Sequence, residues 1–286
     1  MTIYPGAVCG QLNVRGASVE YYESNAPAVG ATGDGAAPVV MLHGTGGSAA
    51  TTFRALFPML ATKYRVIAPS FDSESADELT LEDLVDQAVA VIQDQAPGVP
   101  VTLLGHSLGA VVAAQLAATR PELVENLVLV SGWVRTDPHQ LLRNDLWHQL
   151  HGIGGPSLGA FMTLCTYSGD FLAARTTQEI ETLVVEAADG PDRRAAMRLN
   201  RTIDLTETLP SIEAETLVVG CELDFMAPVR QAKQLFGGIK NACYYEIRSG
   251  HSVTRERPAE LFFVVHDFLR SKPKYLPGTV IPRLSA

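Results

Sequence analysis

Ser107 stands in a pattern that is typical of a nucleophilic serine. It is the centre of Gly-His-Ser-Leu-Gly, which follows the apolar run Val101–Leu104 and precedes the helix-forming run Ala110–Ala118. A G-x-S-x-G turn between a strand and a helix is a nucleophile elbow, and its glycines avoid collisions that a Cβ atom would cause. A serine in an ordinary turn would leave the second glycine unexplained. We therefore expect the hydroxyl of Ser107 to attack a substrate.

A serine nucleophile needs a general base, and the base needs a group that orients it. His251 is the best-placed base, because it lies between the last strand pattern and the closing helix pattern. Glu222 and Asp224 both follow another strand pattern, at 216–219, and either could orient the histidine. We favour Asp224, which lies further into its loop.

The remaining histidines are interpreted differently. His106 directly precedes the nucleophile in the turn and should point away from it. His43 is interpreted as structural, with hydrogen bonds inside its own loop. Surface or packing roles are expected for His139, His148, His151 and His266.

The segments that must position these residues alternate between strand and helix patterns. A hairpin is expected over 11–22, and apolar runs indicate strands at 39–42, 65–69, 101–104, 127–130, 216–219 and 243–248. Helical spacing is found at 52–63, 80–95, 110–118, 229–235 and 258–270. This alternation predicts an α/β fold with a mostly parallel sheet and helices on both faces.

Three segments interrupt this alternation. Residues 135–209 show only helical patterns, so we expect a helical insertion over the C-terminal edge of the sheet, where such folds bind ligands. The stretch 26–38 is rich in Ala, Gly and Pro and is expected to be a flexible surface loop. The tail, 271–286, is expected either to wrap the surface or to be mobile.

Taken together, four motifs resemble the α/β-hydrolase fold family, in particular its esterases and lipase-like members with a helical lid. They are His43-Gly44-Thr45-Gly46-Gly47, Gly105-His-Ser-Leu-Gly109, Gly220-x-x-x-Asp224-x-x-x-Pro228 and Gly250-His251. The order serine, aspartate, histidine along the chain is the order in that family. The resemblance implies an eight-stranded, mostly parallel sheet, a core of residues 1–134 and 210–286, and a lid of residues 135–209.

The same resemblance implies a role for each site residue. Asp224 orients His251, and His251 takes the proton of Ser107. Two backbone amides, those of Thr45 and Leu108, bind the oxyanion that forms on the substrate.

The function implied is a serine hydrolase that cleaves a carboxylic ester, or a lactone or thioester, through an acyl-enzyme on Ser107. Other enzymes of this fold that use a triad stay open as alternatives: C–C hydrolases, perhydrolases, lyases and cyclases of specialised metabolism. A different class of function is a ligand-binding receptor whose triad is vestigial. Serine at the nucleophile position counts against haloalkane dehalogenases and epoxide hydrolases, which use aspartate.

The substrate pocket is expected to be mainly apolar. Trp147 and Phe161 of the insertion, with Phe225 and Met226 beside the acid, should roof the nucleophile. We expect these residues to favour an uncharged, apolar small molecule. The arginines late in the insertion are interpreted as a solvated helix face: Arg175, Arg193, Arg194, Arg198 and Arg201.

Composition narrows the range of partners. A net charge of −9 argues against nucleic acid and anionic membranes, and no apolar run approaches the length of a membrane span. The absence of a basic-then-apolar start argues against a signal peptide. Four widely spaced cysteines, at 9, 165, 221 and 243, are expected to be free, buried thiols in the cytoplasm. No motif indicates a metal, nucleotide or flavin, and the oligomeric state is not indicated.

Overall fold

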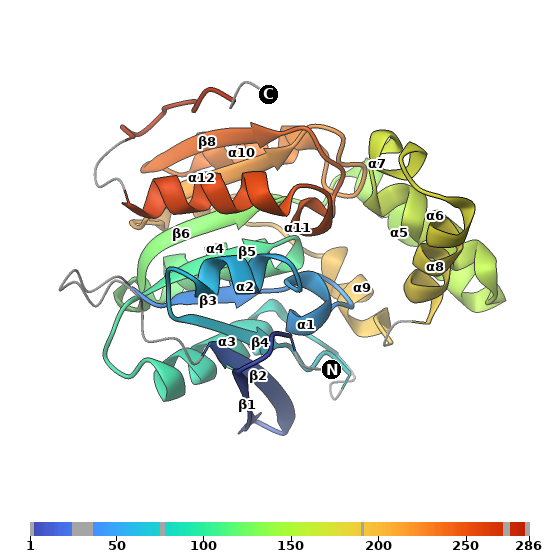
Figure 1. Cartoon of the computed structure of the whole chain (residues 1–286). Helices are drawn as coiled ribbons and strands as arrows, with labels where there is room; N and C mark the ends of the chain where they lie inside the picture. The colour runs from blue at the N-terminus through green and yellow to red at the C-terminus, as the bar shows by residue number, and fades with distance from the viewer. Residues whose placement is uncertain (1–2, 25–36, 75–77, 190–191, 271–274, 284–286) are drawn as a thin grey trace.

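An eight-stranded sheet forms the centre of the molecule (Figure 1). The computed structural model describes residues 3–24, 37–74, 78–189, 192–270 and 275–283. In chain order the strands are β1 (Ala7–Val14), β2 (Ala17–Ser24), β3 (Val39–Leu42), β4 (Val66–Ser70), β5 (Val101–His106), β6 (Val124–Val130), β7 (Glu215–Cys221) and β8 (Ala242–Ile247).

The order of the strands across the sheet is β1-β2-β4-β3-β5-β6-β7-β8. The first two pairings, β1 with β2 and β2 with β4, are antiparallel. All the others are parallel, so the predicted eight-stranded and mostly parallel sheet is confirmed.

Helices cover both faces of this sheet. One face packs against α3 (Leu81–Gln95), α4 (Leu108–Thr119) and α10 (Val229–Gly238). The other packs against α1 (Ala49–Thr52), α2 (Leu56–Ala61), α11 (Val253–Glu256) and α12 (Pro258–Arg270). Two short 3₁₀ turns occupy Pro121–Leu123 and Leu209–Ser211.

The helix predicted over 52–63 is in fact two short helices, α1 and α2. The chain leaves helical geometry at Phe53, which closes α1 and whose side chain is fully buried. The helical spacing of the apolar residues was correct, because Leu56, Phe57 and Leu60 all lie in the core. The spacing could not reveal the bend between the two helices.

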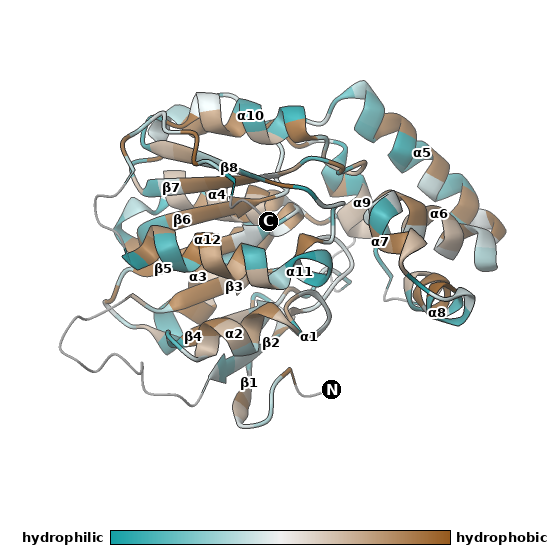
Figure 2. Ribbon diagram, turned by 45° about the horizontal axis from the view of Figure 1, so that its top comes forward, coloured by the Kyte–Doolittle hydropathy of each residue, from teal (hydrophilic) through white to brown (hydrophobic). Residues whose placement is uncertain are grey.

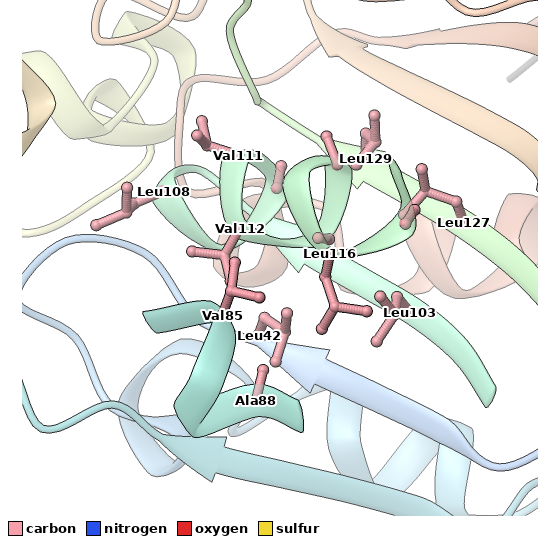
Figure 3. Close-up of a cluster of buried hydrophobic side chains, with 14 of the residues drawn as sticks. Leu42, Val85, Ala88, Leu103, Leu108, Val111, Val112, Leu116, Leu127 and Leu129 are labelled. Atoms are coloured by element: carbon pink, nitrogen blue, oxygen red, sulfur yellow. The ribbon is translucent and has the colours of Figure 1, made fainter. Parts of the chain in front are cut away.

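The central strands are buried on both faces, which explains why they appear in the sequence as continuous apolar runs. Within β5, Leu103 packs with α3 and α4, whereas its neighbour Leu104 packs on the opposite face. Figure 3 shows Leu103 beside Leu42, Leu116 and Leu127. In Figure 2 the strands β5, β6 and β7 are mostly coloured as hydrophobic.

Five helices between β6 and β7 form the segment expected to be an insertion. They are α5 (Pro138–Ile153), α6 (Pro156–Thr166), α7 (Gly169–Ala173), α8 (Thr177–Ala188) and α9 (Arg194–Asn200). They gather beyond one end of the sheet in Figure 1. Trp147, Leu158, Met162 and Met197 form a separate apolar cluster inside this segment.

The described part of the tail lies along β8. Ile281 and Tyr244 are joined by a backbone hydrogen bond of 2.8 Å, so residues 275–283 extend over the surface. The loop predicted over 26–38 falls, apart from its last two residues, outside the described residues. All four cysteines are free, but Cys9 is exposed, which corrects the expectation that all would be buried.

Leu103→Ala tests the importance of this core. The side chain is fully buried, so its truncation leaves a cavity, and we expect the free energy of unfolding to fall by about 2–5 kcal/mol. Leu142→Ala is the matched control, because Leu142 is 72% exposed and its loss should cost less than about 0.5 kcal/mol. Urea unfolding measures both. Equal losses would contradict the assignment of the core.

Candidate active site

The turn between β5 and α4 holds Ser107 in an unusual backbone conformation. Its φ is 58° and its ψ is −123°, a region that non-glycine residues seldom occupy. The glycines on either side are required by close packing. A Cβ atom at Gly105 would lie 2.2 Å from the carbonyl oxygen of Gly109, and one at Gly109 would lie 2.0 Å from that of Leu42. The sequence motif therefore has the geometry of an elbow.

Ser107, His251 and Asp224 meet at the carboxyl ends of β5, β8 and β7. The Nε2 atom of His251 is 2.8 Å from Oγ of Ser107, and its Nδ1 atom is 2.8 Å from Oδ2 of Asp224. The other carboxylate oxygen accepts the backbone N–H groups of Met226 and Ala227, at 2.8 and 2.9 Å. All three side chains are buried. Asp224 is thus fixed as an acceptor on both of its oxygens.

Glu222, the alternative acid, faces elsewhere. Its carboxylate pairs with Arg283 at 2.9 Å and with Arg248 at 3.7 Å. Of the two carboxylates in this loop, Asp224 is therefore the one beside His251.

The two predicted oxyanion donors lie on either side of the serine. Leu108 is the first residue of α4, and Thr45 follows Gly44 in the loop after β3. A Cβ atom at Gly44 would lie 2.8 Å from Cβ of Ser107, so this loop lies against that serine. Among the described residues, neither backbone N–H has a recorded acceptor, so both are available to donate. A residue of the helical segment binds the side chain of Thr45: Nδ2 of Asn200 donates to its Oγ1 at 2.9 Å.

His106 and His43 have structural partners. Nε2 of His106 lies 2.9 Å from the carbonyl oxygen of His251, and so its ring braces the loop that carries His251. Nδ1 of His43 lies 2.8 Å from the carbonyl oxygen of Gly44, and its Nε2 accepts the N–H of Phe71 at 2.8 Å. The expected hydrogen bond of His43 within its own loop is present.

A cavity of about 170 Å³ opens above Ser107 and His251. The core contributes the loop after β3, Trp133 and the residues that follow Asp224. The helical segment supplies the opposite wall, with Gln140, Arg143, Asn144, Met162, Thr166, Arg193, Met197 and Asn200. Its described lining contains two arginines and no aspartate or glutamate.

The predicted pocket residues are mostly not in this lining. Met226 lines the cavity, as expected, but Trp147, Phe161 and Phe225 do not. Trp147 is buried among the apolar residues of the insertion, and Phe161 packs against the same cluster. Phe225 is half exposed and packs edge-on against His139. Three of the four residues expected to roof Ser107 therefore pack elsewhere.

The interpretation of the insertion arginines also needs correction. Arg194 and Arg201 do lie at the surface, paired with Asp192 and Asp145. Arg193 is different, because it is only partly exposed and lines the cavity. Sequence analysis missed Arg143 altogether.

A signal for Arg143 was present in the sequence. Gln140, Arg143, Asn144 and Trp147 follow the spacing of one helical face, and in α5 three of them line the cavity. This face is polar over its first two turns. A pocket predicted from apolar residues alone therefore does not include it.

Strand order, elbow and the serine–histidine–aspartate arrangement define the architecture of an α/β hydrolase. Residues 39–263 match the alpha/beta hydrolase family, and the chain belongs to that family. It is similar to a Xenorhabdus hominickii protein named pyrrolizixenacetamide deacetylase, with 30% identity over 84% of this chain and 93% of that protein.

Solved structures agree with this fold. An alpha/beta hydrolase enzyme from a Medee basin deep-sea metagenome library superimposes with a TM-score of 0.80 at 19% identity, covering 92% of this chain and 98% of that one. The enol-lactonase of Burkholderia xenovorans LB400 superimposes with a TM-score of 0.77 at 19% identity, covering 92% and 100%.

The family and the deacetylase relative together identify the chain as a hydrolase. Within the described ranges, no helix is both long and apolar enough to cross a bilayer.

The two buried histidines make stability dependent on pH. Burial lowers the pKa of His43 and of His106 to about 4, whereas an unfolded chain titrates histidine near 6.5. The unfolded state therefore binds more protons between these values, and stability falls as pH drops from about 6.5 to 4. Each histidine contributes up to about 1.4 kcal/mol per pH unit.

Urea unfolding at pH 7, 6 and 5 measures this dependence. His106→Gln should lower the slope of unfolding free energy against pH by about 1.4 kcal/mol per pH unit, which is the equivalent of one bound proton. This holds whatever the substitution does to stability at pH 7. His139→Gln, at a partly exposed position, is the matched control. A slope unchanged by His106→Gln would contradict the assignment.

Proposed function

We propose that this hydrolase cleaves a carboxylic acyl bond, in an ester, lactone or thioester, through an acyl-enzyme on Ser107. The observation that carries the proposal is the 2.8 Å contact between Nε2 of His251 and Oγ of Ser107. A histidine at hydrogen-bonding distance activates a serine that would otherwise be a weak nucleophile.

In the first half of the reaction, Oγ of Ser107 attacks the acyl carbon while its proton moves to Nε2 of His251. Asp224 stabilises the imidazolium through Nδ1 and keeps the ring in the correct tautomer. The N–H groups of Thr45 and Leu108 donate to the oxyanion of the tetrahedral intermediate. The intermediate collapses when His251 gives the proton to the leaving group.

In the second half, water replaces the leaving group. His251 takes a proton from the water as its oxygen attacks the acyl carbon, and then returns that proton to Oγ of Ser107. The products are the carboxylic acid and the free leaving group, with the enzyme restored. We propose that residues 135–209 act as a lid over this chemistry and that residues 1–134 and 210–286 form the catalytic core.

An amide is a second candidate substrate, because the name of the Xenorhabdus relative describes removal of an acetyl group from an acetamide. The same four steps apply, with an amine as leaving group. Protonation of the leaving nitrogen by His251 is then essential, since an amide anion does not depart.

Ser107→Ala is the direct test of the nucleophile. The variant should fold, because the change removes only one oxygen, and should lose nearly all turnover of p-nitrophenyl esters. A fluorophosphonate should label the wild-type protein once, at Ser107, as mass spectrometry of the peptides can show. Labelling at another residue would contradict the proposal.

Asp224→Asn tests the orientation of the base. The amide favours the wrong tautomer of His251, and we expect a loss of about 10⁴-fold in kcat. Glu222→Gln is the matched control in the same loop, since that carboxylate pairs with arginines outside the site. A larger loss in the control would show that the acid has been misassigned.

A further inference from the structure

The cavity above Ser107 has the composition of a binding site for an anionic group. We infer that Arg143 and Arg193 form a carboxylate-binding subsite, so that the substrate of the proposed acyl hydrolase is an acyl compound with a free carboxylate. This inference rests on the proposed function. It replaces the uncharged, apolar substrate that the sequence predicted.

Arg143 enters the cavity from α5 without an ion-pair partner among the described residues. Its Nε atom is buried and has no hydrogen-bond partner. Burial lowers the pKa of this guanidinium, and the negative charge of Asp224 offsets only part of that effect. Both oxygens of Asp224 are already committed to His251 and to two backbone N–H groups.

Arg193 enters from the start of α9 and lies against the loop that carries Thr45. A Cβ atom at Gly46 would lie 2.8 Å from Nε of Arg193, which shows how closely the two chains pack. Burial lowers the pKa of this guanidinium as well. In the described structure its one recorded hydrogen bond is a long one, 3.5 Å, to the carbonyl oxygen of Ala187.

Two guanidinium groups that share a cavity without an acidic residue in its lining are costly, because each loses hydration. The charge of Asp224 offsets only part of this cost at Arg143, and burial is the one recorded influence on Arg193. The neighbouring Arg194 and Arg201, by contrast, have carboxylate partners at the surface. A guanidinium presents parallel N–H donors that match the two oxygens of a carboxylate. A carboxylate on the substrate would supply both the missing charge and the missing acceptors.

Two pairs of matched esters test the inference. One pair places the carboxylate on the acyl group, and the other places it on the leaving group. Mono-p-nitrophenyl glutarate is compared with p-nitrophenyl hexanoate, which has a similar length and no charge. For a carboxylate on the leaving group, 4-acetoxybenzoate is compared with 4-methylphenyl acetate. The wild-type protein should favour the acid in at least one pair, after correction for the uncatalysed rate of each ester.

Arg143→Gln and Arg193→Gln should each lower kcat/KM for the favoured acid at least about tenfold more than for its neutral partner. Arg194→Gln is the control, because Arg194 is exposed, adjacent in sequence and outside the cavity. It should change both substrates of a pair equally. Equal losses on acid and neutral ester in the two cavity variants would overturn the inference.

Binding separates this inference from the proposed function. Calorimetry of Ser107→Ala protein with glutarate or benzoate should detect binding that either glutamine substitution weakens at least about tenfold. If esters are turned over through Ser107 but no acid is preferred or bound, the subsite is wrong and the acyl hydrolase stands. If no ester or amide is cleaved, the proposed function fails, and the calorimetry alone decides whether the arginines bind carboxylates.

Discussion

The close approach of three backbone segments at the elbow is the constraint on which the site depends. Gly109 at the start of α4 lies so near the carbonyl oxygen of Leu42 that no Cβ atom fits between them. The contact brings the end of β3, the end of β5 and the first turn of α4 together. It therefore places the loop of Gly44 and Thr45 beside Ser107, and the positive end of α4 beneath it. Neither effect needs a side chain larger than hydrogen.

The parallel sheet brings the loops of Ser107, Asp224 and His251 together. Parallel strands end at one edge, so the loops after β5, β7 and β8 meet there, although His251 lies 144 positions along the chain from Ser107. Short braces then fix the loops against one another. His106 holds the backbone of His251, and the N–H groups of Met226 and Ala227 hold Asp224. The geometry of the proposed catalytic residues is thus supported mainly by backbone contacts of the core.

The difference between local turns in the core and distant packing in the insertion explains which site residues could be predicted from sequence. The elbow, the histidine and the acid carry local patterns, because each lies at a strand end with a recognisable turn. The contacts of the insertion carry no such pattern. Whether Trp147 or Arg143 faces Ser107 depends on how α5 packs on the core. That packing involves residues far apart in the sequence, such as Gln231 and Gln140. Hydrophobicity alone favoured the tryptophan, and the structure buries it within the insertion instead.

The helical segment contacts the core at several places, and one of them is the loop that carries Thr45. Asn200 of α9 donates to Oγ1 of Thr45, while Arg193 at the start of the same helix packs against Gly46. A carboxylate held by Arg193 would consequently lie next to the loop whose N–H is proposed to stabilise the oxyanion. Substrate recognition and transition-state stabilisation would then share one short segment, 44–47. A substrate without a carboxylate would not contact Arg193 of α9. The preference for acidic over neutral substrates would therefore be expressed in kcat as well as in KM.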